Sequence, residues 1–406
     1  MKSLPATLEI DKIEKFFSLL SESPESQVLQ IPVGSSKFAF GGYAAAIQAV
    51  NTWANLSKDR KVEIKPSQKT KDEAVVDIIA QPHKFTAMMM AKQIDLPSEE
   101  TPNVRPDINH QAKCAIEQQS ENNFGQNRGR LCWYSFVDHS TKGFAPQFYS
   151  TVPGYHPSPK SVDKITSLVR SMVERSASVA GGATLPDDSK VNNLGRMFYE
   201  LFINTHEHGT KSENRSVWLK PATRVIYSYG INLVEEAISK SISNDEVLSQ
   251  YIDNLNQTQN STRRFVEISI VDSGLGFCGR WLADHNGTGS IKEMDVSEQY
   301  AILKQCFKFR SSSTPDEIKG NGLPAVMANL TALNGFMKVR SNNLSVYRDF
   351  VSNPFLSIQN DDYDFFDWHT KKCCSEKVTE QANTRGVAVT VLIPLFDKGV
   401  DQEVTL

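Results

Sequence analysis

The segment VNNLGRMFYELFINTHEHG, residues 191–209, most constrains the fold, because it predicts one helix with two different faces. At about 100° per residue, an apolar stripe runs along one side of this helix. A second face carries Glu200, Asn204, Glu207 and His208. We therefore expect a helix that packs on a sheet through the stripe and presents polar groups on its other face. The stripe consists of Val191, Leu194, Phe198, Leu201, Phe202 and Thr205.

The polar face of this helix has the composition of a metal-assisted site. Asn204 and either carboxylate could bind Mg²⁺, a hard cation that prefers oxygen ligands. A carboxylate beside that metal could orient or deprotonate a water molecule. The alternative is that this face is the solvated side of an ordinary amphipathic helix. His206 is expected to point elsewhere and to be structural.

A second feature is the segment RFVEISIVDSGLGF, residues 264–277, in which a predicted strand runs directly into Asp-x-Gly-x-Gly. Gly274 and Gly276 permit positive φ and let a flat ligand lie against bare backbone. The carboxylate of Asp272, at the strand end, could accept a hydrogen bond from an exocyclic amine such as that of adenine. An ordinary turn is the alternative interpretation.

Two further segments follow in the chain. KGNGLPAV, residues 319–326, places Gly-x-Gly at the start of a predicted helix, where backbone N–H groups and the helix dipole favour an anion. Lys319 lies just upstream and could add positive charge. RGVAVTVLIPL, residues 385–395, predicts a buried strand that contains Thr390, a residue which alone indicates no more than a β-former.

In this order the four segments resemble the motifs of the GHKL ATPase superfamily, which includes gyrase, a heat-shock chaperone, histidine kinases and MutL. The resemblance covers residues 161–406. It implies an α+β protein with a C-terminal Bergerat fold, an α/β sandwich whose mixed sheet has helices on one face. The form E-x-x-x-N-x-x-E-H-G is most similar to the corresponding motif of histidine kinases and anti-sigma kinases. Departures are a long polar insertion at 234–257, Pro324 in the third motif and an extended connection at 361–374.

The resemblance also implies roles for single residues. Glu200 would activate water and contact Mg²⁺ through a water molecule, and Asn204 would be the Mg²⁺ ligand. Asp272 would bind the adenine amine, and Thr390 would reach adenine through water. Residues 278–319 would form a lid over the nucleotide. The remaining candidates for contact with ATP are His208, Gly274, Gly276, Lys319, Gly320, Asn321, Gly322 and Leu323.

The chain is expected to contain two domains. Residues 1–150 predict a separate mixed α/β domain that matches no motif known to us. Residues 151–160 are rich in proline and predict a linker. Strands are predicted at 28–34, 61–66, 74–82, 131–138, 224–233, 264–272 and 386–395, with a hairpin at 336–350. Helices are predicted at 40–56, 85–94, 161–177, 191–208, 234–257, 297–309 and 322–335.

Composition excludes several classes of protein. The net charge is −3 and no polybasic block is present, so nucleic-acid binding is not supported. The longest apolar run is shorter than the roughly 20 residues that cross a bilayer. The N-terminus has no secretory h-region, which favours a cytoplasmic protein. The six cysteines are expected to be free thiols rather than zinc ligands.

Three functions stay open at this point. The first is an ATPase whose Mg²⁺-dependent ATP binding and hydrolysis switch the conformation of the N-terminal domain or a partner protein. The second is a protein kinase of the histidine or anti-sigma (Ser) type. The helix at 161–177 has no histidine, so autophosphorylation is disfavoured, whereas a Ser kinase acting on a separate partner stays open. The third is a module that binds ATP without hydrolysis. A homodimer is also compatible with the resemblance.

Overall fold

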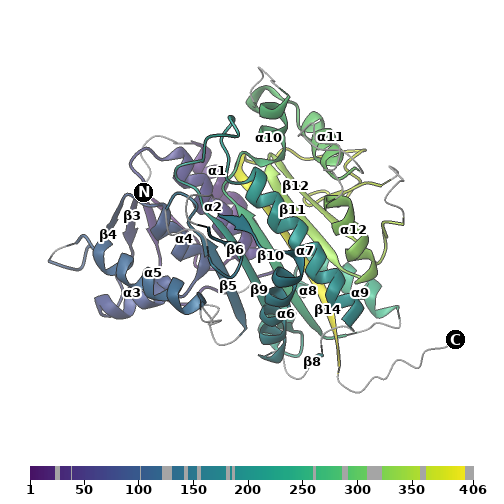
Figure 1. The fold of residues 1–406 in the computed structure, drawn as a ribbon, viewed down its shortest axis with the longest axis horizontal. Coiled ribbons are helices and arrows are strands. Elements are labelled where there is room, and N and C mark those ends of the chain that lie inside the picture. Colours follow the sequence, from purple (N-terminus) through teal and green to yellow (C-terminus); the bar gives the residue numbers. More distant parts are fainter. Residues whose placement is uncertain are drawn as a thin grey trace.

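The structure is a computed structural model, and it is α+β, with helices and both parallel and antiparallel strands (Figure 1). The predicted fold class is therefore confirmed at this level. The residues that it describes are 1–22, 28–37, 39–100, 102–120, 130–140, 145–152, 157–179, 183–184, 188–258, 262–285, 291–308, 322–356 and 363–397.

A large sheet with the strand order β13-β12-β11-β14-β10-β9-β5 forms the centre of the described structure, and β8 pairs with the end of β14. Neighbouring strands in it are antiparallel. The strands are β5 (Leu131–Phe136), β8 (Ala183–Thr184), β9 (Arg224–Asn232), β10 (Arg264–Asp272), β11 (Phe336–Asn342), β12 (Leu344–Asp349), β13 (Phe366–Asp367) and β14 (Thr384–Asp397).

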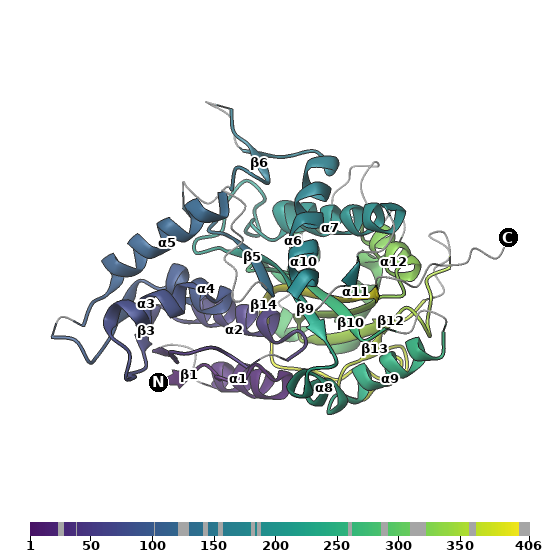
Figure 2. The same ribbon diagram turned by 90° about the horizontal axis from the view of Figure 1, so that it is seen from below.

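Helices cover both faces of this sheet (Figure 2). One face packs against α6 (Val162–Val179), α7 (Asp188–His208) and α12 (Gly322–Ala332). The other packs against α2 (Gly42–Leu56), α8 (Glu236–Ser243) and α9 (Glu246–Asn256). The expectation of helices on one face is therefore corrected. Because both faces are covered, the strands β9, β10 and β11 are buried at nearly every position, and the buried side chains include polar ones such as Glu267, Ser269 and Lys338.

The N-terminal region contributes a second sheet of four parallel strands in the order β1-β2-β3-β4. Its elements are β1 (Lys2–Ser3), α1 (Ile10–Glu22), β2 (Leu29–Ile31), β3 (Lys61–Ile64), α3 (Lys71–Ile79), α4 (Pro82–Met90), β4 (Gln93–Asp95) and α5 (Arg105–Ser120). In the predicted linker, β7 (Ser158–Pro159) pairs with β6 (Tyr149–Ser150).

The hydrophobic core does not divide at the predicted linker. One buried apolar cluster includes Ile31 and Trp53 from the N-terminal region together with Phe265, Phe336 and Leu392 from the large sheet. In addition, β5 precedes the linker but pairs with β9 in the large sheet. A separate N-terminal domain is therefore not confirmed.

The predicted strand at 74–82 is wrong, because these residues belong mostly to helix α3. Its buried side chains, Ala74, Val75, Ile78 and Ile79, recur at helical spacing. A capping box starts the helix, in which the Thr70 side chain accepts from the backbone N–H of Glu73 and the Glu73 side chain accepts from that of Thr70. This local signal outweighs the β-propensity of the run of Val and Ile residues.

The other predicted elements are found with small shifts at their ends. The insertion at 234–257 is a pair of helices, α8 and α9, which packs on the sheet. Downstream of β10 lie α10 (Gly276–Asp284), the short helix η1 (Ile291–Glu293) and α11 (Val296–Cys306). No helix in the described ranges is long and apolar enough to cross a membrane. The six cysteines are free thiols in the structure, and Cys132, Cys278 and Cys374 are buried.

Candidate functional site

The start of α12 lies against the polar face of α7. A Cβ atom built on Gly322 would be 2.7 Å from Oε2 of Glu200 and 3.5 Å from Nδ2 of Asn204. Two sequence motifs far apart in the chain therefore meet, because Gly322 lies next to the side-chain ends of Glu200 and Asn204. The partly buried Leu323 packs against the apolar cluster that also contains the stripe of α7.

Glu200 and Asn204 are both held partly out of water. Burial raises the pKa of Glu200, and the nearby charge of Glu207 raises it further. A carboxylate with a raised pKa is a stronger base at neutral pH than an ordinary glutamate. The side-chain Nδ2 of Asn204 is buried and has no hydrogen-bond partner among the described residues. Turning the amide would exchange nitrogen for oxygen at this place, so Asn204 can offer either a donor or a cation ligand there.

Asp272 is the last residue of β10 and lies next to Gly209, the residue that follows the C-terminal end of α7. Its side chain is only 3% exposed, and Oδ1 accepts hydrogen bonds from the backbone N–H groups of Gly274 at 2.8 Å and Val387 at 3.3 Å. Burial raises the pKa of Asp272 to about 6. The group is therefore mainly ionised above neutral pH and acts there as a hydrogen-bond acceptor.

Glycines after α7 and after β10 let these two backbone segments approach Asp272 closely. A Cβ atom on Gly209, the residue after α7, would be 2.6 Å from Cγ of Asp272. A Cβ atom on Gly274 would be 2.7 Å from Cα of Gly209. Gly276 has a φ of 78°, so the predicted positive φ is confirmed at that glycine. The loop after β10 thus closes tightly on the end of α7.

Gly386 also packs against Asp272, although the sequence motifs did not single it out. It has a φ of 74°, and a Cβ atom there would collide with the backbone oxygen of Asp272. Its N–H donates to the backbone oxygen of Gly274 at 2.9 Å. Asn342 was also missed. Its side chain accepts from the N–H of Cys278 at 3.1 Å and donates to the oxygen of Leu275 at 3.0 Å, at the start of α10. The glycine near the start of the last strand, β14, was the signal in the sequence that could have identified Gly386.

The side chain of Thr390 does not lie beside Asp272. Its Oγ1 accepts a hydrogen bond from Ser269 at 2.9 Å and lies 3.8 Å from a Cβ atom built on Gly41, just before α2. Side chains alternate between the two faces of a strand, and Asp272 projects to the α7 face while Ser269 and Thr390 project to the α2 face. The expected role of Thr390 is therefore corrected. The positions on β14 that lie against Asp272 are Gly386 and Val387.

His208 lies in a buried charged cluster between α7 and α10. Its Nδ1 is 3.2 Å from Nη2 of Arg215, which also forms an ion pair with Asp284. Burial, followed by the charge of Arg215, lowers the pKa of His208 to about 4, so its imidazole is neutral at pH 7. The neighbouring His206 contacts the hydroxyl of Tyr149 at 3.2 Å, in agreement with a structural role.

Three predicted phosphate-site residues, Lys319, Gly320 and Asn321, lie outside the described residues. The described part of the predicted lid contains α10, η1 and α11. Tyr300 and Leu303 of α11 are buried in the apolar core, so this part of the range is packed structure.

A separate cavity of about 370 Å³ lies between α4, α5 and β5. Its lining includes Met89, Ile116 and Ser135. None of the predicted site residues lines it.

Within the described ranges, no group of three or more His, Cys, Asp or Glu side chains could hold a metal ion. Mg²⁺ does not require such a cage, because it commonly combines one or two protein ligands with water and phosphate oxygens. Glu200 and Asn204 fit that pattern. No protein-family model, curated protein or solved structure matches this chain.

Proposed function

We propose that this chain binds ATP together with Mg²⁺ through a Bergerat-type site and hydrolyses it slowly to switch its own conformation or that of a partner protein. The observation that carries the proposal is the meeting of Glu200 and Asn204 with Gly322 at the start of α12. Asp272 lies at the C-terminal end of the same helix, next to Gly209. One helix thus connects a base-binding carboxylate with a phosphate-binding helix start.

Asp272 is the residue that we assign to the adenine amine. Both of its backbone hydrogen bonds go to Oδ1, which leaves Oδ2 as the acceptor for the base. A buried acceptor with a fixed orientation favours one donor pattern, because a wrong partner would leave the carboxylate without its hydrogen bond. The close packing of Gly209 and Gly274 against this carboxylate fixes its position.

Where α12 begins beside Glu200 and Asn204, the backbone N–H groups and dipole of α12 favour the negative charge of the phosphates. Asn204 would hold Mg²⁺, which when bound neutralises phosphate charge. Glu200, with its raised pKa, would orient the attacking water and accept its proton.

Calorimetry with a non-hydrolysable ATP analogue and Mg²⁺ tests the binding part of the proposal. We expect the wild type to bind and Asp272→Asn to lose about tenfold or more in affinity, since the amide replaces one acceptor oxygen with a donor. Equal affinities for the two proteins would remove Asp272 from the adenine site.

Release of phosphate tests the chemical part. Glu200→Gln keeps the shape of the side chain but cannot accept a proton, so we expect hydrolysis to fall by about 100-fold or more while the analogue still binds. Transfer of labelled phosphate to a protein instead of water would assign the chain to the kinases. Hydrolysis by Glu200→Gln at the wild-type rate would contradict the assigned role.

A further inference from the structure

Helix α2 carries three buried polar side chains on one face, although it lies inside an apolar core. Gln48 and Asn51 are 0% exposed and Thr52 is 4% exposed. Their spacing of three and four residues places them side by side on the helix. Buried amides and hydroxyls destabilise a core unless each one is hydrogen-bonded. Their partners therefore indicate what this face is for.

Asn51 bonds to the backbone of the predicted base-binding residue. Its Nδ2 donates to the backbone oxygen of Asp272 at 3.2 Å, and its Oδ1 accepts from the hydroxyl of Thr223 at 3.0 Å. The N–H of Thr223 in turn donates to Oγ of Ser273 at 2.9 Å. One side chain of α2 thus contacts the residue at the strand end directly and the next residue through Thr223.

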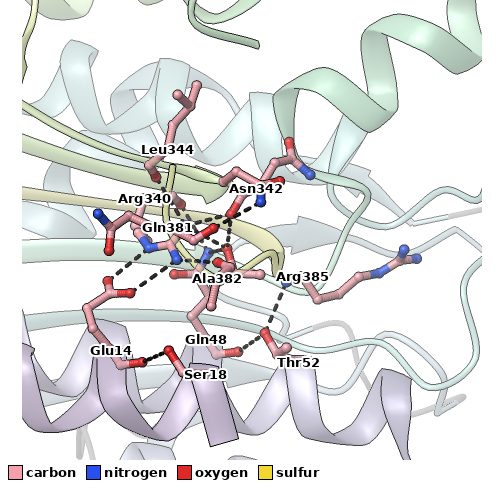
Figure 3. Close-up of polar contacts among 12 residues, drawn as sticks. Glu14, Ser18, Gln48, Thr52, Arg340, Asn342, Leu344, Gln381, Ala382 and Arg385 are labelled. Carbon is pink, nitrogen blue, oxygen red and sulfur yellow. Dashed lines mark hydrogen bonds and ion pairs between the residues drawn. The ribbon is translucent and has the colours of Figure 1, made fainter. Parts of the chain in front are cut away.

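Gln48 and Thr52 bond to backbone groups of β11 and of the start of β14, which lies beside the loop after β10 (Figure 3). Nε2 of Gln48 donates to the backbone oxygens of Arg340 at 3.0 Å and Gly386 at 3.3 Å. Oγ1 of Thr52 accepts from the backbone N–H of Arg385 at 3.0 Å. Gly386 also bonds to Gly274. Helix α2, the loop after β10 and the start of β14 therefore form one hydrogen-bonded unit.

Helix α1 joins this unit through a nearly buried ion pair. Nε of Arg340 donates to Glu14 at 2.9 Å, and Nη1 donates to the backbone oxygen of Asn342 at 2.6 Å (Figure 3). The Asn342 side chain bonds to Leu275 and Cys278 at the start of α10. Helix α2 therefore bonds directly to backbone groups around Asp272, whereas α1 is connected to them through Arg340.

We infer that α2 is the positioning element of the nucleotide site, and that the N-terminal region and the nucleotide are coupled through Asn51, Gln48 and Thr52. The inference rests on the proposed function and adds its route of regulation. A shift of α2 would break its hydrogen bonds to the end of β10 and to the start of β14. The position of α2 and the conformation that binds the base are therefore linked. By reciprocity, a ligand that stabilises the loop also stabilises the docked position of α2.

The test compares three variants with a matched control. Asn51→Ala removes the bond to Asp272, and Thr52→Val removes the acceptor for Arg385 while nearly keeping the side-chain volume. Thr52→Ser keeps the hydroxyl and should restore the wild-type behaviour. Val50→Ala is the control, because Val50 is equally buried but lies on the opposite side of α2.

Hydrogen–deuterium exchange without nucleotide is the first readout. We expect faster exchange of the backbone amides at 272–276 and 384–387 in Asn51→Ala and Thr52→Val than in Val50→Ala. Calorimetry with a non-hydrolysable ATP analogue and Mg²⁺ is the second. We expect the dissociation constant to rise about tenfold in those two variants and less than about twofold in Val50→Ala. This difference should hold even if Val50→Ala lowers the melting temperature as much as the other two variants do.

The outcomes separate the two proposals. If the wild type binds no analogue, the proposed function fails, and the exchange data alone decide whether α2 positions the loop. Equal exchange in Asn51→Ala and Val50→Ala would overturn the positioning role. Faster exchange with an unchanged dissociation constant would overturn the coupling to the nucleotide.

Discussion

At the residue scale, Glu267 is a buried carboxylate at the junction between β10 and α2. It is 0% exposed, and it accepts hydrogen bonds from the N–H of Gly41 at 3.1 Å and from the hydroxyl of Tyr227. Burial raises its pKa from 4.5 to about 7. The charged form is therefore destabilised in the folded protein, and its two donors offset only part of that cost.

This gives a prediction for the pH dependence of stability. Between about pH 4.5 and 7 the folded state binds more protons at Glu267 than the unfolded state, so the free energy of unfolding falls as the pH rises through that window. In Glu267→Gln this contribution is absent. We expect the variant to gain stability relative to wild type from pH 4.5 to 7.5, by up to about 3 kcal/mol.

Urea unfolding at a series of pH values measures this difference. Lys338 faces the same carboxylate, but burial lowers its pKa only to about 8, above the window used. A stability difference between Glu267→Gln and wild type that does not change with pH would contradict the prediction.

The residue scale also explains why Thr390 was misplaced. Its match to a motif depends only on distance along the chain, whereas its role depends on which face of β14 it occupies. The register that pairs Ser269 with Thr390 decides that face, and a single-residue slip would reverse it. Glu200 and Asn204 are different, because their shared face follows from helical spacing alone.

At the element scale, α3 shows how a short local signal decides between helix and strand. Its sequence KDEAVVDII contains the apolar run that suggested a strand, yet Val76 in the middle of the run is 53% exposed. The capping box at Thr70 and Glu73 satisfies backbone N–H groups that would otherwise be free at the helix start.

Loss of this cap should therefore destabilise the protein. We expect Thr70→Ala to lower the free energy of unfolding by about 1 kcal/mol, whereas Thr70→Ser should stay close to wild type. Both side chains of the capping box lie at the surface, so no cavity complicates the comparison. Denaturant unfolding measures both values, and an equal loss in the two variants would show that the hydroxyl does not cap the helix.

At the scale of the whole molecule, the N-terminal region covers part of one face of the large sheet. Helix α2 packs on β10 and β14, and its apolar neighbours Tyr227 and Tyr229 belong to β9. A sheet whose other face is already covered by α6, α7 and α12 would expose these apolar side chains if α2 were removed. Stability of the two regions is therefore shared.

We accordingly expect a single unfolding transition for the whole chain. Ile47→Ala, which removes a fully buried side chain of α2, should lower the free energy of unfolding by about 2–5 kcal/mol and shift that one transition. Val76→Ala, at an exposed position, is the control and should shift it little. Scanning calorimetry measures this, and two separate peaks would instead indicate independent domains.

The sequence by itself determined the features that depend on neighbouring residues. These are the two faces of α7, the strand that ends at Asp272, the glycine turn after it and the helix start at Gly322. All of them follow from local periodicity and from the conformational freedom of glycine. The tertiary structure alone decided the features that depend on long-range pairing. These are the face occupied by Thr390, the approach of Gly386 to Asp272 and the docking of Gln48, Asn51 and Thr52 behind the site, because β-register and helix docking join residues far apart in the chain.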